Sequence, residues 1–259
     1  MSADSGANPL TPVVDGTKTI KLKHRPLGPW DARDAFIALC AVTIAPFAIA
    51  LTFYILGRVS ILPQSIASLF IAENPVATLV QYLTALTVEV GLIGLLMHYK
   101  QASLQALGVR SFKWRWLLAV LGLYVAQAIL VIIVFTLIQV LSPKVNLDEA
   151  QDVFEFGKTN WAVIGTFISA VIIAPILEEI IFRGIIYVGL TKIWPRWVSA
   201  VLTAILFGWL HAQLNVGIYT FLLGLLLTWL YVKSRSLIPG IILHMLNNAV
   251  AFWLLLGPK

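Results

Sequence analysis

Long apolar stretches that hold very few charges constrain the fold of this chain more than any other feature. A helix needs about 20 apolar residues to cross the hydrocarbon core of a bilayer. Only 12% of the residues are charged, whereas soluble domains carry roughly 25%. We therefore predict an all-α, polytopic transmembrane helix bundle of seven spans, or eight if one stretch is divided. The predicted spans cover residues 35–56, 76–97, 116–141, 161–190, 197–211, 216–232 and 237–256.

Positive charge is distributed unevenly around these predicted spans. With the N-terminus inside, 13 Lys and Arg residues fall on the cytoplasmic side and four on the other. The larger set is Lys18, Lys21, Lys23, Arg25, Arg33, Lys100, Arg110, Lys113, Arg115, Lys192, Arg196, Lys233 and Arg235, and the smaller is Arg58, Lys144, Lys158 and Lys259. Since cytoplasmic loops are rich in Lys and Arg, this asymmetry predicts an N-in, C-out topology. The net charge of +6 then requires no nucleic acid, because topology and anionic lipids account for it.

Two adjacent carboxylates interrupt the fourth predicted span. Glu178 and Glu179 follow 17 uncharged residues, 161–177, and Arg183 comes one helical turn later. A charge at membrane depth costs about 2.5 to 3.5 kcal/mol on insertion scales, so intramembrane acids indicate a functional site by default. Pro175 lacks an N–H and leaves the carbonyl of Val171 without its helical partner, which favours a local irregularity before the acids. We expect this long span to tilt or break.

The other polar residues of the last four spans recur at helical spacing. They are His211, His244, Asn247 and Asn248. Residues four apart share a helix face, so Glu179 with Arg183, Phe207 with His211, and His244 with Asn248 each project together. At about 1.5 Å per residue, the acids, both histidines and the asparagines fall at overlapping depths. The spacing therefore predicts one buried polar site formed by three helices.

These three motifs, in this order on membrane helices, resemble the CAAX protease and bacteriocin-processing (Abi) family of intramembrane endopeptidases. The resemblance covers roughly residues 160 to 252. It implies that Glu178 and His211 bind and activate the attacking water, and that His244 and Asn248 stabilise the oxyanion. It also implies that Glu179 and Arg183 support the site as an ion pair and that Phe207 packs against it.

Elementary electrostatics favours the same roles for the two acids. Arg183, one turn after Glu179, would keep that carboxylate ionised and leave Glu178 free to take and return a proton. An imidazole and an amide four residues apart are suitable donors for a developing oxyanion. Apolar walls around such a site would strengthen each electrostatic contact.

The residues leave the question of a metal open. Two histidines and a carboxylate, here Glu178, His211 and His244, match the ligand set of a catalytic zinc site with water in the fourth position. The same groups can also activate water without an ion. The sequence therefore supports either one divalent metal such as Zn²⁺ or metal-free water activation.

We accordingly expect a chain with three parts. Residues 1–33 form a disordered cytoplasmic tail, residues 34–157 the N-terminal transmembrane helices, and residues 158–259 the catalytic transmembrane core. The hypothesis is an endopeptidase of the bacterial cytoplasmic (inner) membrane that cleaves a membrane-embedded or lipidated peptide or protein.

Other interpretations of the same residues are structural or belong to another functional class. Each motif alone is typical of an ion pair, an interfacial histidine or interhelical hydrogen bonding, and only their conjunction favours catalysis. Glu89, in the second span, is interpreted as a packing or hydration group. The alternative functions are a non-proteolytic scaffold or immunity factor and a proton-coupled transporter. The substrate and the oligomeric state have no signature in the sequence.

Overall fold

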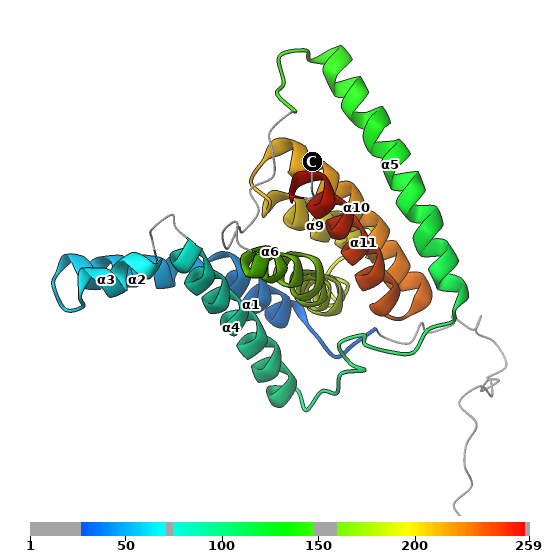
Figure 1. Cartoon of the computed structure of the whole chain (residues 1–259). Helices are drawn as coiled ribbons and strands as arrows, with labels where there is room; N and C mark the ends of the chain where they lie inside the picture. Colours follow the sequence, from blue (N-terminus) through cyan, green and yellow to red (C-terminus); the bar gives the residue numbers. More distant parts are fainter. Residues whose placement is uncertain (1–26, 71–74, 148–159, 257–259) are drawn as a thin grey trace, which may run out of the picture.

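The computed structural model describes residues 27–70, 75–147 and 160–256. Every regular element in these ranges is a helix, which confirms the predicted all-α class. Four helices are long and apolar enough to cross a membrane, or five if the bent pair α1 and α2 is one span. Figure 1 shows a bundle from which α2 (Ala45–Arg58) and α3 (Gln64–Ala67) project to one side.

Two of the predicted spans agree closely with single long helices. The predicted spans 76–97 and 116–141 correspond to α4 (Pro75–Tyr99) and α5 (Arg115–Leu141). Most of the α5 surface is exposed, and it includes large apolar side chains such as Leu118, Ile132 and Val140. Such a surface suits contact with lipid, because a helix in a bilayer gains little from burying leucine or valine against protein.

The first predicted span, 35–56, is not one continuous helix. Helix α1 (Ala32–Thr43) and α2 meet at Ile44 with a bend of 43°. Pro46 lies at the start of α2, where it cannot donate the backbone hydrogen bond that a continuous helix needs, and a kink at this point is the expected result. After α2 come α3 and the short 3₁₀ turn η1 (Ser68–Phe70).

The fourth predicted span forms one long helix over Trp161–Leu190. It is α-helical in α6 (Asn160–Phe167), α7 (Ala174–Glu179) and α8 (Val188–Leu190), and π-helical in η2 (Ile168–Ile173) and η3 (Ile180–Tyr187). At the end of η2 the N–H of Ala174 bonds to the carbonyl of Ser169, five residues earlier. The irregularity predicted around Pro175 is therefore a π segment, and the helix does not break.

The last three predicted spans correspond to α9 (Arg196–Trp209), α10 (Leu214–Ser234) and α11 (Ile238–Leu256). Helix α9 is shorter than the predicted span 197–211, because the chain turns after Trp209 and Ala212 takes a positive φ of 59°. Only α10 of these three meets the length criterion for a span. The predicted count of seven or eight is not confirmed and stays a prediction.

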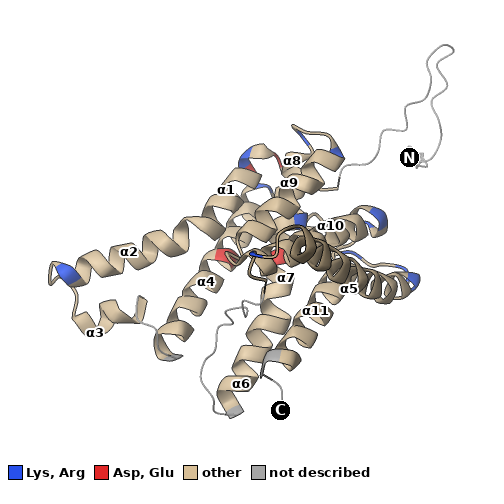
Figure 2. Ribbon diagram, turned by 90° about the horizontal axis from the view of Figure 1, so that it is seen from above, with Lys and Arg blue, Asp and Glu red and all other residues tan. Residues whose placement is uncertain are grey.

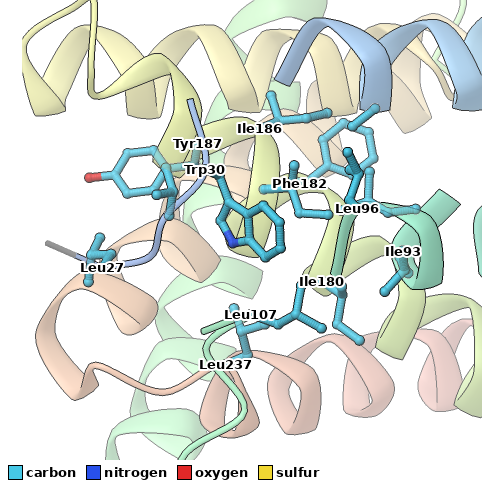
Figure 3. Packing of buried hydrophobic residues seen from close by; sticks show 14 of the residues in the cluster. Leu27, Trp30, Ile93, Leu96, Leu107, Ile180, Phe182, Ile186, Tyr187 and Leu237 are labelled. Atoms are coloured by element: carbon cyan, nitrogen blue, oxygen red, sulfur yellow. The ribbon is translucent and has the colours of Figure 1, made fainter. Parts of the chain in front are cut away.

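The principal apolar core lies between α4, η3 and a segment before α1. Trp30 is completely buried, and its indole Nε1 donates to the carbonyl of Ala106 at 3.2 Å. Figure 3 shows Trp30 among side chains that include Leu107 and Phe182. Residues 27–33, which the sequence placed at the end of a disordered tail, are thus ordered here, and residues 1–26 lie outside the described residues.

Charged residues are found mostly at the helix ends and loops. In Figure 2 the Lys and Arg residues lie largely near the ends of α1, α5, α8, α9 and α10, while acidic segments of α4 and α7 lie between the helix ends. This distribution agrees with the asymmetry used for the N-in topology, and the orientation itself stays a prediction. The cationic residues that lie outside the described residues are Lys18, Lys21, Lys23, Arg25, Lys158 and Lys259.

Candidate active site

The two adjacent glutamates lie in a single short α-helical segment between two π segments. Glu178 and Glu179 end α7, with η2 before them and η3 after them. Because π segments insert an extra residue into a helical turn, they re-aim the side chains around them and are frequent at functional sites. Adjacent positions on a helix point about 100° apart, so the two carboxylates enter different surroundings.

Glu179 forms a buried ion pair with Arg183. Arg183 Nη1 donates to Oε1 of Glu179 at 2.8 Å, and the two side chains are 0% and 1% exposed. Arg183 Nη2 also donates to the carbonyl of Gly224 in α10 at 3.3 Å. The guanidinium carbon lies 4.4 Å from the centre of the Phe207 ring, a cation–π contact. Arg183 therefore links the glutamate helix to α9 and α10.

His244 of α11 lies between the two carboxylates. Its Nδ1 is 3.1 Å from Oε1 of Glu179, and its Nε2 is 3.6 Å from Oε2 of Glu178. A carboxylate paired with Arg183 accepts hydrogen bonds, so Nδ1 carries the proton that it donates to Glu179. This leaves Nε2 to face Glu178, and the structure thus brings together predicted residues from two separate motifs.

The two glutamates differ in access to the site. The Glu178 side chain is 29% exposed, whereas that of Glu179 is 1% exposed and fixed by both Arg183 and His244. Among the described side chains, the histidine within ion-pair distance of Glu178 is His244 and not His211. A small molecule can therefore reach Glu178 but not Glu179.

His211 lies two residues beyond the end of α9. Its Nδ1 is 2.8 Å from the carbonyl oxygen of Phe207. Since a carbonyl oxygen only accepts, Nδ1 carries the proton and the neutral ring presents Nε2 as an acceptor. The side chain is half-buried, so that Nε2 lone pair remains available to a ligand.

Phe207 connects the two histidines. Its ring packs edge to face against both imidazoles, with centroid separations of 5.0 Å to His211 and 5.6 Å to His244. The phenyl ring is buried and also contacts Phe182 and Arg183. Phe207, which was predicted to pack against the site, thus lies between side chains of η3, of α11 and of the segment after α9.

Asn248 is held by the π segment η2. Its Nδ2 donates to the carbonyl of Ala170 at 2.8 Å. An amide nitrogen carries two N–H donors, so this bond fixes the side chain and leaves a second donor. No sequence pattern indicates this anchor, because it depends on where a π segment directs a backbone carbonyl.

Two further groups beside the site come from α10 and were not singled out by sequence reasoning. The Tyr219 hydroxyl bonds to Oδ1 of Asn247, whose amide in turn donates to the carbonyl of Leu243. Gly224 accepts from Arg183 through its backbone. The contact of Tyr219 could have been predicted, because a tyrosine within a predicted membrane helix usually has a polar partner. The contact of Gly224 could not, because it involves only the backbone of that residue.

The three side chains considered as metal ligands do not form a metal-binding group in this structure. Among the described residues, no cluster of three His, Cys, Asp or Glu side chains has an arrangement that could hold an ion. Glu178 and His244 are close, whereas His211 lies across the Phe207 ring. Metal-assisted and metal-free water activation therefore both stay predictions, and no step below is routed through a metal.

Comparison with known proteins shows that the same part of the chain is similar to a peptidase family. Residues 159–250 match the family model described as type II CAAX prenyl endopeptidase Rce1-like. The chain is 34% identical over 100 residues to an Escherichia coli protein described as an uncharacterized 24.3 kDa protein, which covers 37% of this chain and 45% of that protein. It is 30% identical over 87 residues to the "Putative membrane peptidase YdiL" of Bacillus subtilis (strain 168), over 34% of this chain and 36% of that protein.

The chain spans less than half of the length of either of these relatives. No solved structure matches. The matched region contains Glu178, Glu179, Arg183, Phe207, His211, His244 and Asn248. The chain is thus an integral membrane protein whose residues 159–250 are similar to the type II CAAX prenyl endopeptidase Rce1-like family, the resemblance that the three motifs indicated.

Proposed function

We propose that this protein is an intramembrane endopeptidase that hydrolyses a peptide bond in a membrane-associated protein or peptide. One observation carries the proposal above the others: His244 contacts both glutamates inside the region that matches an endopeptidase family. A buried cluster of carboxylate and imidazole groups can take up and release protons during a reaction. The family description supports peptide hydrolysis as the reaction that uses it.

Glu178 is the general base of the proposed reaction, with His211 as its partner in holding the water. Glu178 is the accessible carboxylate, since Glu179 is occupied by Arg183 and His244. His211 presents an acceptor nitrogen once Nδ1 has donated to Phe207. Glu178 takes one proton of the water, and the hydroxide oxygen bonds to the carbonyl carbon of the substrate.

His244, in its imidazolium form with a second N–H at Nε2, and Asn248 stabilise the negative oxygen of the resulting tetrahedral intermediate. Each occupies the same face of α11, and Asn248 keeps one N–H beyond the bond to Ala170. A single donor to an oxyanion lowers the barrier by about 2.7 to 4 kcal/mol. The carbon–nitrogen bond then breaks, and the proton held by Glu178 passes to the departing amine, which restores the base.

Glu179 and Arg183 hold this arrangement in place. Their ion pair fixes the partner of His244 Nδ1 and so the direction of its Nε2 toward Glu178. A chain that left Glu179 without Arg183 would hold an uncompensated charge at membrane depth. The pair is thus a support for the site and takes no part in bond making.

The substrate comes from the membrane and is a lipidated or membrane-embedded peptide. The matched family is described as prenyl endopeptidases and one relative as a membrane peptidase, so a prenylated C-terminal peptide is the first probe to use. We place the protein in the cytoplasmic (inner) membrane of a bacterium, with the tail inside.

A comparison of membrane proteins in living cells tests the proposal without knowledge of the substrate. Cells that carry the wild-type chain, Glu178→Gln or the control Thr87→Val are analysed for new protein termini in the membrane fraction. Thr87 lies on an exposed face of α4 and bonds only to its own helix. Termini present in wild type and Thr87→Val but absent in Glu178→Gln support proteolysis, and identical sets in all three strains refute it.

A further inference from the structure

Tyr219 of α10 directs its hydroxyl at the helix that carries His244 and Asn248. The hydroxyl bonds to Oδ1 of Asn247, a residue that is 3% exposed. The amide nitrogen of Asn247 donates to the carbonyl of Leu243 at 2.8 Å, so Oδ1 is the acceptor and the tyrosine is the donor. The proposed reaction assigns no role to Tyr219 or Asn247.

Apolar packing fixes the ring of Tyr219. The ring lies against a buried cluster that α5, α10 and α11 share, with Val120, Leu223 and Leu243 among its members. Because the tyrosine ring is rigid, packing that fixes the ring also fixes the direction of the hydroxyl. Phenylalanine at this position would therefore keep the packing and lose only the hydroxyl.

The turn of α11 that carries the two site residues is held from two sides. On one side Asn247 accepts from Tyr219 of α10, and on the other Asn248 donates to the carbonyl of Ala170 in η2 at 2.8 Å. Adjacent residues of a helix point about 100° apart, so the two bonds together resist rotation of α11 about its axis. His244 lies one turn before Asn248, and the same restraint fixes the direction of its ring.

These contacts complete a closed ring of bonds through three helices. Arg183 donates to the carbonyl of Gly224 in α10 at 3.3 Å and to Oε1 of Glu179 at 2.8 Å. The same Oε1 lies 3.1 Å from Nδ1 of His244. From His244 the ring follows α11 and returns to α10 through the hydroxyl of Tyr219. Helix α10 is therefore bonded both to the glutamate helix and to α11.

We propose that Tyr219 is a positioning residue of the site, which acts through Asn247 to fix the rotation of α11 and so the directions of His244 and Asn248. The catalytic consequence rests on the proposed function, and Tyr219 acts without touching the substrate. Donors for an oxyanion are effective only when they are aligned with the oxygen of the transition state. Loss of the restraint therefore lowers kcat and leaves KM unchanged.

The proposal is tested by cleavage kinetics in liposomes, with a quenched fluorescent prenylated peptide as the probe. The control Thr220→Val removes the hydroxyl of the next residue, which is also buried and bonds to carbonyls of its own helix at 2.7 and 3.3 Å. We expect kcat to fall about 10- to 100-fold in Tyr219→Phe, with the KM of wild type, and to keep its wild-type value in Thr220→Val. A wild-type kcat in Tyr219→Phe, or an equal loss in both variants, overturns the proposal.

A double-mutant cycle shows whether the tyrosine acts through Asn247. Asn247→Leu keeps most of the side-chain volume and removes the acceptor of the Tyr219 hydroxyl. Residues that act through one contact have effects that do not add. We expect the kcat of Tyr219→Phe combined with Asn247→Leu to lie within about twofold of that of Asn247→Leu alone. Losses that multiply would show that Tyr219 acts by another route and would overturn the proposal.

The side-chain amide of Asn248 gives a readout that does not depend on turnover. In protein labelled with ¹⁵N-asparagine its NMR signal is identified by its loss in Asn248→Ala. We expect the signal to shift and to exchange faster with solvent in Tyr219→Phe, and to stay unchanged in Thr220→Val. An unchanged signal in Tyr219→Phe overturns the positioning role. If the wild-type protein cleaves neither the probe nor any membrane protein while the signal responds as expected, the proposed function fails and the restraint on α11 stands.

Discussion

Replacement of Arg183 by methionine is expected to destabilise the protein more than any other single change at the site. Methionine fills much of the volume of the arginine stem but leaves Glu179 charged and buried, with 1% of its side chain exposed. Two unit charges 2.8 Å apart attract by about 6 kcal/mol at an effective dielectric constant near 20. Desolvation offsets part of this attraction, and breaking a buried pair typically costs about 3 to 5 kcal/mol.

The cation–π contact with Phe207 and the bond to Gly224 are lost in the same variant. We expect Arg183→Met to lower the free energy of unfolding by about 3 to 5 kcal/mol. The double variant Glu179→Gln with Arg183→Met removes the orphaned charge, so its loss is smaller than that of Arg183→Met alone. This order is the signature of an uncompensated carboxylate.

Unfolding in mixed micelles, followed by circular dichroism as the fraction of sodium dodecyl sulfate rises, measures these differences. Glu179→Gln alone completes the double-mutant cycle. The reasoning is refuted if Arg183→Met unfolds with the wild-type protein, or if the double variant is less stable than Arg183→Met. Either result would mean that the charge of Glu179 is not buried against Arg183.

Two further outcomes follow from contacts outside the site. Gly184→Ala places a methyl group 2.6 Å from the backbone oxygen of Leu107, whereas Gly94→Ala meets nothing within 4 Å. Gly184→Ala should therefore cost about 1 to 3 kcal/mol, and Gly94→Ala should be neutral or stabilising by up to about 1 kcal/mol; equal unfolding of the two would contradict this packing. At the end of α4, Lys100 donates to Asp31 at 2.9 Å and lowers the pKa of that carboxyl group from 3.8. The stabilisation is full above pH 3.8 and is lost as the pH falls through the lower folded-state pKa. Wild type should be more stable than Asp31→Asn by no more than about 1 kcal/mol, because the pair is half-exposed. In unfolding measurements at acidic pH this difference should disappear. A difference that stays constant with pH would show that Asp31 does not titrate in the pair.

The sequence predicted the membrane helices best where apolar residues run without interruption. Helices α4 and α5 begin and end within two residues of their predicted bounds. The first predicted span is bent by 43° at the junction of α1 and α2, next to Pro46, which the prediction of one straight helix did not include. Membrane helices can tolerate a proline near the start of a long apolar run, so Pro46 alone does not predict a bend. The bend is seen only in the structure, where α2 packs with α3 and η1.

The depth of each polar residue along its helix could be predicted from the sequence. The direction in which its side chain points around the helix axis could not. A rise of 1.5 Å per residue placed the acids and histidines at similar depths, and the structure brings His244 to both glutamates. Contacts such as Asn248 with Ala170 depend on the π segment η2, which shifts the register of every following side chain. No residue pattern indicates such a shift. The pair of Glu179 and Arg183, in contrast, could be predicted, because the two residues are four apart and lie within about one helical turn.

The surroundings of Glu89 become visible only when the fold is known. Taken as a sequence position, it is one acid in the second apolar span, and packing or hydration was the simpler reading. Its neighbours Ile93 and Leu96 on the same stripe pack into the core beside the glutamate helix. Which residues of η3 lie next to this stripe depends on packing between helices, and spacing within either helix cannot predict that packing.

The central claim is that Glu178 takes a proton from water within the membrane. Its most direct test is the kcat/KM of purified protein in liposomes for the prenylated fluorescent peptide, in wild type and Glu178→Gln. We expect kcat/KM to fall by at least about 100-fold in Glu178→Gln with an unchanged unfolding transition. Turnover of Glu178→Gln within a few-fold of wild type would contradict it.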